Sequence, residues 1–219
     1  MTSSPFTLPF DKLPVSLPIF PLPGVIVMPG APLPLNVFEP RYLNMVTDAL
    51  AEDRMIGMVQ PDPRAADPLG ETVCRTGTAG RITAFNETRD GRFLIRLTGV
   101  CRFDIQEEVP TLRGYRRVIA DWSRFAADYE SAGRVPERRD LLDRLKRYAE
   151  SRQLEIEWDT LRVLDDLELV NVLVTMLPLD VADKQALVEA VTLAERARLL
   201  SGLLEIARVP IAELSPRTH

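Results

Sequence analysis

The residues from Phe93 to Gln106 alternate between apolar and polar side chains over most of their length. Successive side chains of a β-strand point to opposite faces of a sheet, so this period of two predicts one long strand. The chain must therefore cover one side of a sheet with a core and leave the other side to solvent. The apolar or small positions are Phe93, Ile95, Leu97, Gly99, Cys101, Phe103 and Ile105, and the polar positions are Arg96, Thr98, Arg102, Asp104 and Gln106.

A tight turn is expected just before this strand. The pair Asp90-Gly91 is favoured in β-hairpins, so the partner strand should run from about Thr72 to Glu87. Gly99 lies inside the long strand and predicts a bulge or a bend.

The composition changes near residue 122. Most of the glycines and prolines precede this point, whereas the residues after it are rich in Leu, Ala, Glu and Arg. This division predicts an α+β protein, with a β-rich part over residues 15–122 and a helical bundle over residues 123–209. Residues 1–14 are expected to form a flexible N-terminal arm and residues 210–219 a tail.

Local patterns predict the shorter elements. Prolines lack the N–H that a central strand needs, so residues 21–34 should form loops around a short strand at Val25–Met28. Extended structure should resume at Leu35–Phe38, and Pro40 suits the first turn of a helix that ends near Asp53. The other expected strands are Val15–Phe20, Met55–Gln60 and 114–121, and the other expected helices are about 137–151, 159–164, 165–177, 180–190 and 192–208.

Charge and motifs argue against several classes of function. The net charge is -5, whereas a general nucleic-acid binder needs a basic surface. The sequence contains no GxxxxGK[ST] phosphate loop, no GxGxxG and no GxSxG. The single histidine, His219, supports neither a catalytic triad nor a metal site, and Lys184 is expected to face solvent rather than join a Ser/Lys dyad. We therefore expect no enzyme activity, no metal and no cofactor.

The two cysteines are expected to be free. Cys101 should face a residue near Gly80, which leaves Cys74 on the order of 20 Å further along the ladder at ~3.4 Å per residue. A disulfide requires Cα atoms within ~7 Å, so reduced thiols in a cytoplasmic protein are expected. The sequence shows no secretory signal and no apolar run of the ~20 residues that a membrane span needs.

Several blocks of sequence resemble the N-terminal, substrate-binding domain of Lon-type proteases. The blocks are LPIFPLPGVIVMPG at 17–30, VFEPRY at 37–42, GTAGRI at 77–82, LTGVCRF at 97–103, and LPL followed by DKQALVE within 177–189. VFEPRY is the most specific of them, and the likeness spans about residues 15–207. Asn36 departs from the family pattern, where many relatives carry His, and Thr78 stands where Cys is common.

The resemblance implies a PUA-like β pseudo-barrel followed by a helical bundle. It also implies a non-catalytic module, without an attached ATPase or peptidase, whose partners are unfolded or tagged polypeptides, or a protease or adaptor protein. The candidate contact residues are Asn36, Phe38, Glu39, Arg41, Tyr42 and Arg81. The structural interpretation of the same residues places Phe38 and Tyr42 in the core. It has Glu39 and Arg41 capping the helix or pairing internally, for instance with Arg81.

Two other functions stay open at this point. A β domain rimmed by loops can hold a small-ligand pocket, as the related domain of cereblon suggests, and a PUA-like fold can bind RNA, which the acidic charge disfavours. An edge of the sheet could also offer main-chain hydrogen bonds to a peptide. The last helix carries a broad apolar stripe, which favours an intramolecular core, and hence a monomer, over a dimer seam.

Overall fold

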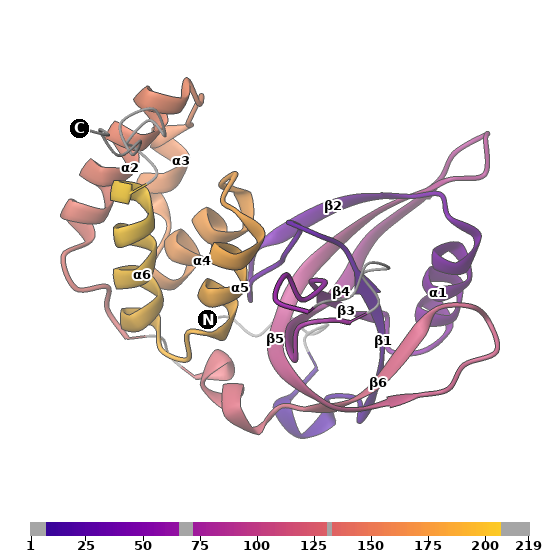
Figure 1. The fold of residues 1–219 in the computed structure, drawn as a ribbon. Coiled ribbons are helices and arrows are strands. Elements are labelled where there is room, and N and C mark those ends of the chain that lie inside the picture. The colour runs from indigo at the N-terminus through magenta and orange to yellow at the C-terminus, as the bar shows by residue number, and fades with distance from the viewer. Residues whose placement is uncertain (1–7, 66–71, 131–132, 207–219) are drawn as a thin grey trace, which may run out of the picture.

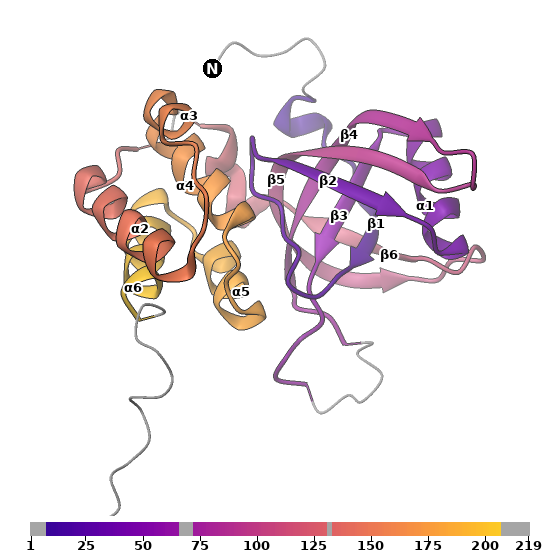
Figure 2. The same cartoon turned by 90° about the horizontal axis from the view of Figure 1, so that it is seen from above.

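The computed structural model describes residues 8–65, 72–130 and 133–206. A β-barrel lies beside a bundle of helices (Figure 1), so the α+β class that the composition predicted is confirmed. Figure 2 shows the barrel and the helices as two neighbouring halves. We call them the barrel half and the helical half.

The barrel half contains β1 (Ser16–Pro21), β2 (Pro32–Val37), α1 (Pro40–Ala51), β3 (Met55–Val59), β4 (Thr76–Glu87), β5 (Phe93–Val109) and β6 (Arg116–Asp121), preceded by the 3-10 helix η1 (Phe10–Lys12). The 3-10 helix η2 (Ser123–Tyr129) leads into α2 (Arg138–Arg152), α3 (Trp158–Val163), α4 (Asp166–Met176), α5 (Val181–Glu189) and α6 (Leu193–Ile206). Each expected α-helix is present with small shifts at its ends. The predicted end of the last helix, at 208, lies outside the described residues.

The sheet closes on itself. Its strands follow the order β2-β5-β4-β3-β1-β6, and β6 pairs in addition with β5. The length of β5, 17 residues, allows this closure: its first part pairs with β2 and its last part with β6. A closed barrel leaves few unpaired backbone groups, and here β2 alone extends the ladder beyond the ring.

Gly99 marks the bend that the sequence predicted in the long strand. The ladder between β4 and β5 shifts its register beside the pair Gly80 and Gly99. A Cβ atom added at Gly99 would lie 2.0 Å from the carbonyl oxygen of Met28. Glycine is therefore needed because another segment of backbone passes directly over the strand. Cys101 faces Ala79, one residue from the expected position, and both cysteines are free and buried.

The proline-rich segment differs from the prediction in two ways. Val25–Met28 is irregular rather than a strand, because its backbone bonds to the helical half: the Met28 N–H donates to Thr175 Oγ1 over 3.2 Å. Pro32 and Pro34, expected in a loop, lie in β2.

The prolines of β2 are tolerated because this strand is an edge. The Gly99 N–H donates to the Ala31 carbonyl over 3.0 Å, so the odd-numbered residues of β2 turn their backbone groups toward β5. Pro32 and Pro34 then direct their nitrogens away from the sheet, where no ladder bond is lost.

Helix α1 closes one end of the barrel. Tyr42, Met45, Val46 and Ala49 are buried against apolar side chains of the strands. The helix begins at Pro40, as predicted, and Glu39 occupies the capping position without a side-chain capping bond. A second buried cluster fills the rest of the barrel, and a third fills the helical half.

The bonds that cap the helices differ within the helical half. Asp165 and Glu168 form a full capping box at α4. Before α6, Thr192 accepts from the Glu195 N–H over 3.1 Å, but the Glu195 carboxylate accepts from the Val191 N–H, so only half of a capping box forms. Asp180 precedes α5 without a side-chain capping bond.

Arg102 lies at the junction of the two halves, and its burial contradicts the polar, solvent-facing position predicted for it. Its side chain is 1% exposed and forms an ion pair of 2.7 Å with Asp128. The guanidinium also donates to the carbonyls of Val188, Ala190 and Val191. The helices cover this part of the outer face of β5, which period-two alternation within the strand cannot reveal.

Lys184 is also buried, at 7% exposed, so the prediction that it faces solvent is wrong. Its Nζ atom donates to the Gly24 carbonyl over 2.8 Å, and burial lowers the pKa of its ammonium group. The neighbouring Gln185 donates to the carbonyl of Thr76 and accepts from the side-chain amide of Gln60. One face of α5 therefore joins the barrel half rather than water.

Residues 8–14 differ from the loose arm expected at the N-terminus. Tyr129 donates to the Leu8 carbonyl over 3.0 Å, and Leu13 is buried in the barrel cluster. Residues 1–7 and 207–219, which include the predicted tail, lie outside the described residues. Among the helices that the structure describes, none has the length and apolar character of a membrane span.

Candidate functional site

Four large apolar side chains are exposed at one end of the barrel. They are Phe38 (62% exposed), Phe85 (43%), Leu94 (44%) and Leu112 (fully exposed). Phe38 joins β2 to α1, Phe85 and Leu94 flank the β4–β5 hairpin, and Leu112 lies between β5 and β6. These segments lie at the end of the barrel far from the helical half (Figure 1). We call these four residues the distal surface.

The register of the sheet arranges the distal surface on both faces of the hairpin. Phe85 and Phe93 meet edge to face, with ring centroids 5.0 Å apart. Leu94 lies opposite Asn36 on β2 and Asn86 on β4, which places these three side chains in one row. Phe38 follows directly after Val37, the partner of Phe93.

The loop that carries Leu112 is fixed to α1. Arg113 forms an ion pair of 3.0 Å with Asp48, and Tyr115 donates to the same carboxylate over 2.9 Å. A Cβ atom added at Gly114, which has a φ of +80°, would lie 3.4 Å from Arg41 Cβ. The loop therefore rests against the first turn of the helix.

The motif VFEPRY contributes both to this surface and to the core beneath it. Glu39 and Arg41 pair over 2.9 Å and are about half exposed, which confirms an internal pair. Tyr42 is buried against Phe20, with centroids 4.2 Å apart, and burial raises the pKa of its hydroxyl. Phe38 was expected in the core on structural grounds, and its exposure shows that this expectation is wrong.

Five of the six candidate residues lie along β2 and α1. Asn36, Phe38, Glu39 and Arg41 reach solvent, whereas Tyr42 is buried beneath them. Arg81 lies elsewhere on β4, opposite Met55 and Thr98, five residues before the row that contains Asn86. No hydrogen bond or ion pair between described residues joins Arg81 to Glu39 or Arg41, so the proposed pairing with Arg81 is not present.

The sequence contained a signal for the residues that were missed. Leu94 interrupts the alternation of β5, because it places an apolar side chain between Phe93 and Ile95 on the face expected to be polar. Phe85 likewise lies among polar residues before the hairpin. An exposed apolar group in a strand is informative when it recurs on neighbouring segments.

The edge of the sheet offers little to an incoming strand. Only Asn36 retains an N–H among the three β2 residues that turn outward, because the other two are Pro32 and Pro34. Addition of a peptide strand depends on a row of free donors and acceptors. The idea that this edge supplies main-chain hydrogen bonds is therefore not supported, and side-chain contacts at the distal surface are favoured.

The two cysteines lie outside the distal surface and are buried. Burial raises the pKa of Cys74 to about 11 and raises the pKa of Cys101 further still, which keeps both thiols protonated at neutral pH. Among the described residues, no three His, Cys, Asp or Glu side chains gather as a metal site would need. The distal surface itself presents apolar groups beside the ion pairs Glu39–Arg41 and Arg113–Asp48.

Comparison with known proteins identifies the family. The family model of the substrate-binding domain of ATP-dependent protease La (Lon) matches residues 16–205, which include both halves. The chain belongs to this family. A Lon protease of Parabacteroides distasonis is 28% identical over 221 residues, and one of Flavobacterium johnsoniae is 26% identical over 191 residues. These alignments cover 98% and 85% of this chain but only 27% and 23% of the relatives, so the chain spans about a quarter of their length.

Solved structures share the fold. A Lon N-terminal domain protein from Xanthomonas campestris superimposes with a TM-score of 0.61 at 24% identity, over 85% of this chain and 97% of that chain. The N-terminal domain of a Mycobacterium avium complex Lon protease gives 0.62 at 18% identity, over 87% and 98%. In this Lon-family chain, the hydrogen bond from Lys184 to the Gly24 carbonyl joins the block 183–189 to the block 17–30, and so links the two halves.

Proposed function

We propose that this Lon-family chain is a non-catalytic recognition module that binds exposed apolar segments of unfolded or tagged polypeptides through its distal surface. We further propose that it serves proteolysis as an adaptor or regulator. Membership of a substrate-binding family supports the general role. The observation that carries the site is the gathering of Phe38, Phe85, Leu94 and Leu112 at one end of the barrel.

Energetics favour this choice of site. Burial of apolar surface is worth about 25 cal/mol per Å², so side chains already held in position gain affinity without a large cost of ordering. The anchored loop around Arg113 and the edge-to-face contact of Phe85 provide that order. An unfolded polypeptide exposes the apolar groups that such a surface needs.

A cytoplasmic, monomeric form is part of the same proposal. Two buried free thiols suit a reducing compartment. The apolar stripe of α6, expected to face the core, is largely buried within the helical half, with Leu193, Ala197, Leu200 and Leu204 inside.

The test is the affinity for an unfolded model polypeptide, measured by fluorescence anisotropy with reduced and carboxymethylated lactalbumin. Replacement of Phe38, Phe85 and Leu112 by serine should raise the Kd at least tenfold, because these groups bear the apolar contact. The matched control is Met176→Ser, which removes an apolar side chain 72% exposed on α4 in the other half. Equal Kd values for the triple variant and the wild type would show that the distal surface is not the site.

A further inference from the structure

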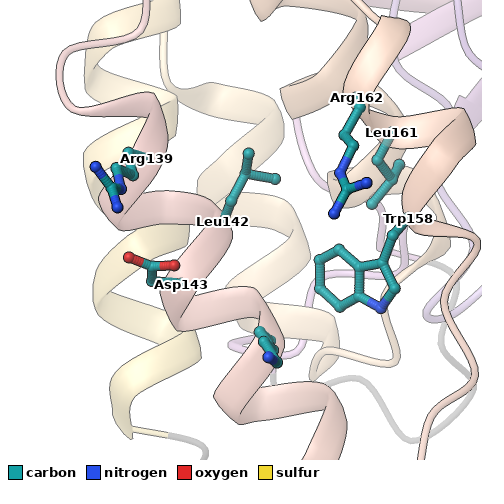
Figure 3. A pocket seen from close by; sticks show the side chains of 7 residues that line it. Arg139, Leu142, Asp143, Trp158, Leu161 and Arg162 are labelled. Carbon is teal, nitrogen blue, oxygen red and sulfur yellow. The ribbon is translucent and has the colours of Figure 1, made fainter.

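A cleft opens between α2 and α3, in the helical half. Its volume is about 530 Å³, within the range of ligand sites (Figure 3). Leu142 on α2 and Trp158 and Leu161 on α3 provide its apolar lining, and the indole of Trp158 lies in the gap between the two helices. Trp158 and Leu142 are only partly buried, so apolar area remains for a bound group.

Helical spacing explains why these side chains meet. The α2 residues Arg139, Leu142, Asp143 and Lys146 follow a spacing of three and four, which places them on one face. On α3, Trp158, Leu161 and Arg162 repeat the same spacing and turn toward α2. Residues 154 and 156 of the connection pack into the same cluster and hold α3 in place.

The rim of the cleft is positive, although the chain is acidic overall. Arg139, Lys146 and Arg162 supply three cations against the single carboxylate of Asp143. Within the described part of the chain, no ion pair or hydrogen bond uses the side chain of Arg139, Asp143 or Lys146. Arg162 pairs only with Asp159, over 3.2 Å, where both side chains are largely exposed and the pair is weak.

We infer that this cleft binds an acidic peptide segment that carries an apolar side chain. The apolar group would pack on Trp158 between Leu142 and Leu161, and carboxylates on either side would pair with the cations. Arg139 and Lys146 are seven residues apart, about 10 Å along the helix, which matches about three residues of extended peptide. The guanidinium groups favour carboxylates because each can donate two parallel hydrogen bonds.

This site is separate from the distal surface in place and in chemistry. The distal surface lies on the barrel half, whereas the cleft lies on the helical half (Figure 1). The distal surface selects apolar groups, and the cleft adds a requirement for negative charge. The chain would therefore hold two different segments of its partners at once.

The experiment uses Trp158 as the reporter. The chain has two tryptophans, so Trp122→Phe leaves Trp158 as the only tryptophan emitter. The probe is a decapeptide of alternating glutamate and leucine, and the matched probe has lysine in place of glutamate. We expect the acidic peptide to change the Trp158 emission, to bind more weakly in high salt, and to bind at least tenfold more tightly than the basic peptide.

Variants assign the effect to the rim. Reversal of charge at Arg139, Lys146 and Arg162 to glutamate should raise the Kd for the acidic peptide at least tenfold. The corresponding glutamine variant, which replaces it if the reversal impairs folding, should also raise this Kd. Arg198→Glu, an exposed change on α6 with the same charge difference per site, should leave the Kd unchanged.

Two outcomes overturn the inference. One is equal binding of the acidic and basic peptides, and the other is an acidic-peptide Kd that the glutamine variant leaves unaltered. The serine variants at Phe38, Phe85 and Leu112 separate this site from the proposed function, because they should not alter the Trp158 response. Loss of the response in those variants alone would place the peptide at the distal surface instead.

Discussion

At the scale of single residues, the buried side chain of Arg102 makes a large contribution to the stability of the fold. Its guanidinium and the Asp128 carboxylate are both almost fully buried, and they pair over 2.7 Å. Removal of one member leaves the other charge buried without compensation, which typically costs 3–5 kcal/mol. We therefore predict that Arg102→Met lowers the free energy of unfolding by about that amount in urea titrations.

A matched exposed pair provides the control for this prediction. Arg92 and Asp90 pair over 2.9 Å at the hairpin, with both side chains about half exposed. Arg92→Met should change the free energy of unfolding by less than about 1 kcal/mol, because exposed pairs contribute little. Similar losses in the two variants would mean that burial does not amplify the Arg102 pair.

The buried thiols predict a dependence on pH. Because burial raises the pKa of Cys74 to about 11, its folded-state pKa lies above the unfolded value near 9. The unfolded chain loses its proton first, so the contribution of this thiol to stability is complete below pH 9 and declines as pH rises toward 11. The native protein should react with a thiol reagent at pH 8 far more slowly than the urea-unfolded protein. Comparable rates would show that the thiols are accessible.

At the scale of elements, the prolines of β2 prevent another strand from pairing with the open edge of the sheet. Pro32 and Pro34 remove two of the three N–H groups that would face an incoming strand. Replacement of both by valine restores the donors and raises β-propensity, so we predict concentration-dependent self-association. Sedimentation velocity compares this variant with Pro136→Val, a change at an exposed residue before α2. An entirely monomeric edge variant would mean that other features protect the edge.

Local periodicity predicted most of these elements, and it failed where tertiary contacts decide. The alternation of β5 and the helix from Pro40 follow from the sequence because each depends on neighbours along the chain. The bend at Gly99 depends on the Met28 backbone, but the glycine that this contact requires is itself visible in the sequence. Val25–Met28 has strand-like composition, but its backbone bonds to α4. The helix that carries Lys184 appears amphipathic with Lys184 facing solvent, but the Lys184 ammonium group donates to the Gly24 carbonyl. Of the candidate site, the motif around Phe38 was found, whereas Leu112 required knowledge of which loops meet at one end of the barrel.

At the scale of the whole molecule, polar side chains join the halves at several points. Asn171 donates to the Pro29 carbonyl over 2.8 Å, and its oxygen accepts from the buried Arg196. Gln185 reaches the Thr76 carbonyl over 3.1 Å. Each buried bond leaves an unsatisfied group when it is broken, at a cost of about 1–3 kcal/mol. The two halves should therefore unfold together although each has its own apolar core.

Single-tryptophan proteins test this coupling. Trp122 packs on Phe103 in the barrel half, and Trp158 packs in the helical half, so each reports one core. We predict coincident urea midpoints for Trp122→Phe and Trp158→Phe in the wild-type background. The same pair should give separated midpoints when Asn171 and Gln185 are changed to alanine, because the halves then lose shared bonds. Thr83→Ala, which removes an exposed bond within the barrel, should keep the midpoints together.

Midpoints that already differ in the wild-type background would show that the halves are independent. Recognition at the distal surface would then not affect the stability of the cleft between α2 and α3.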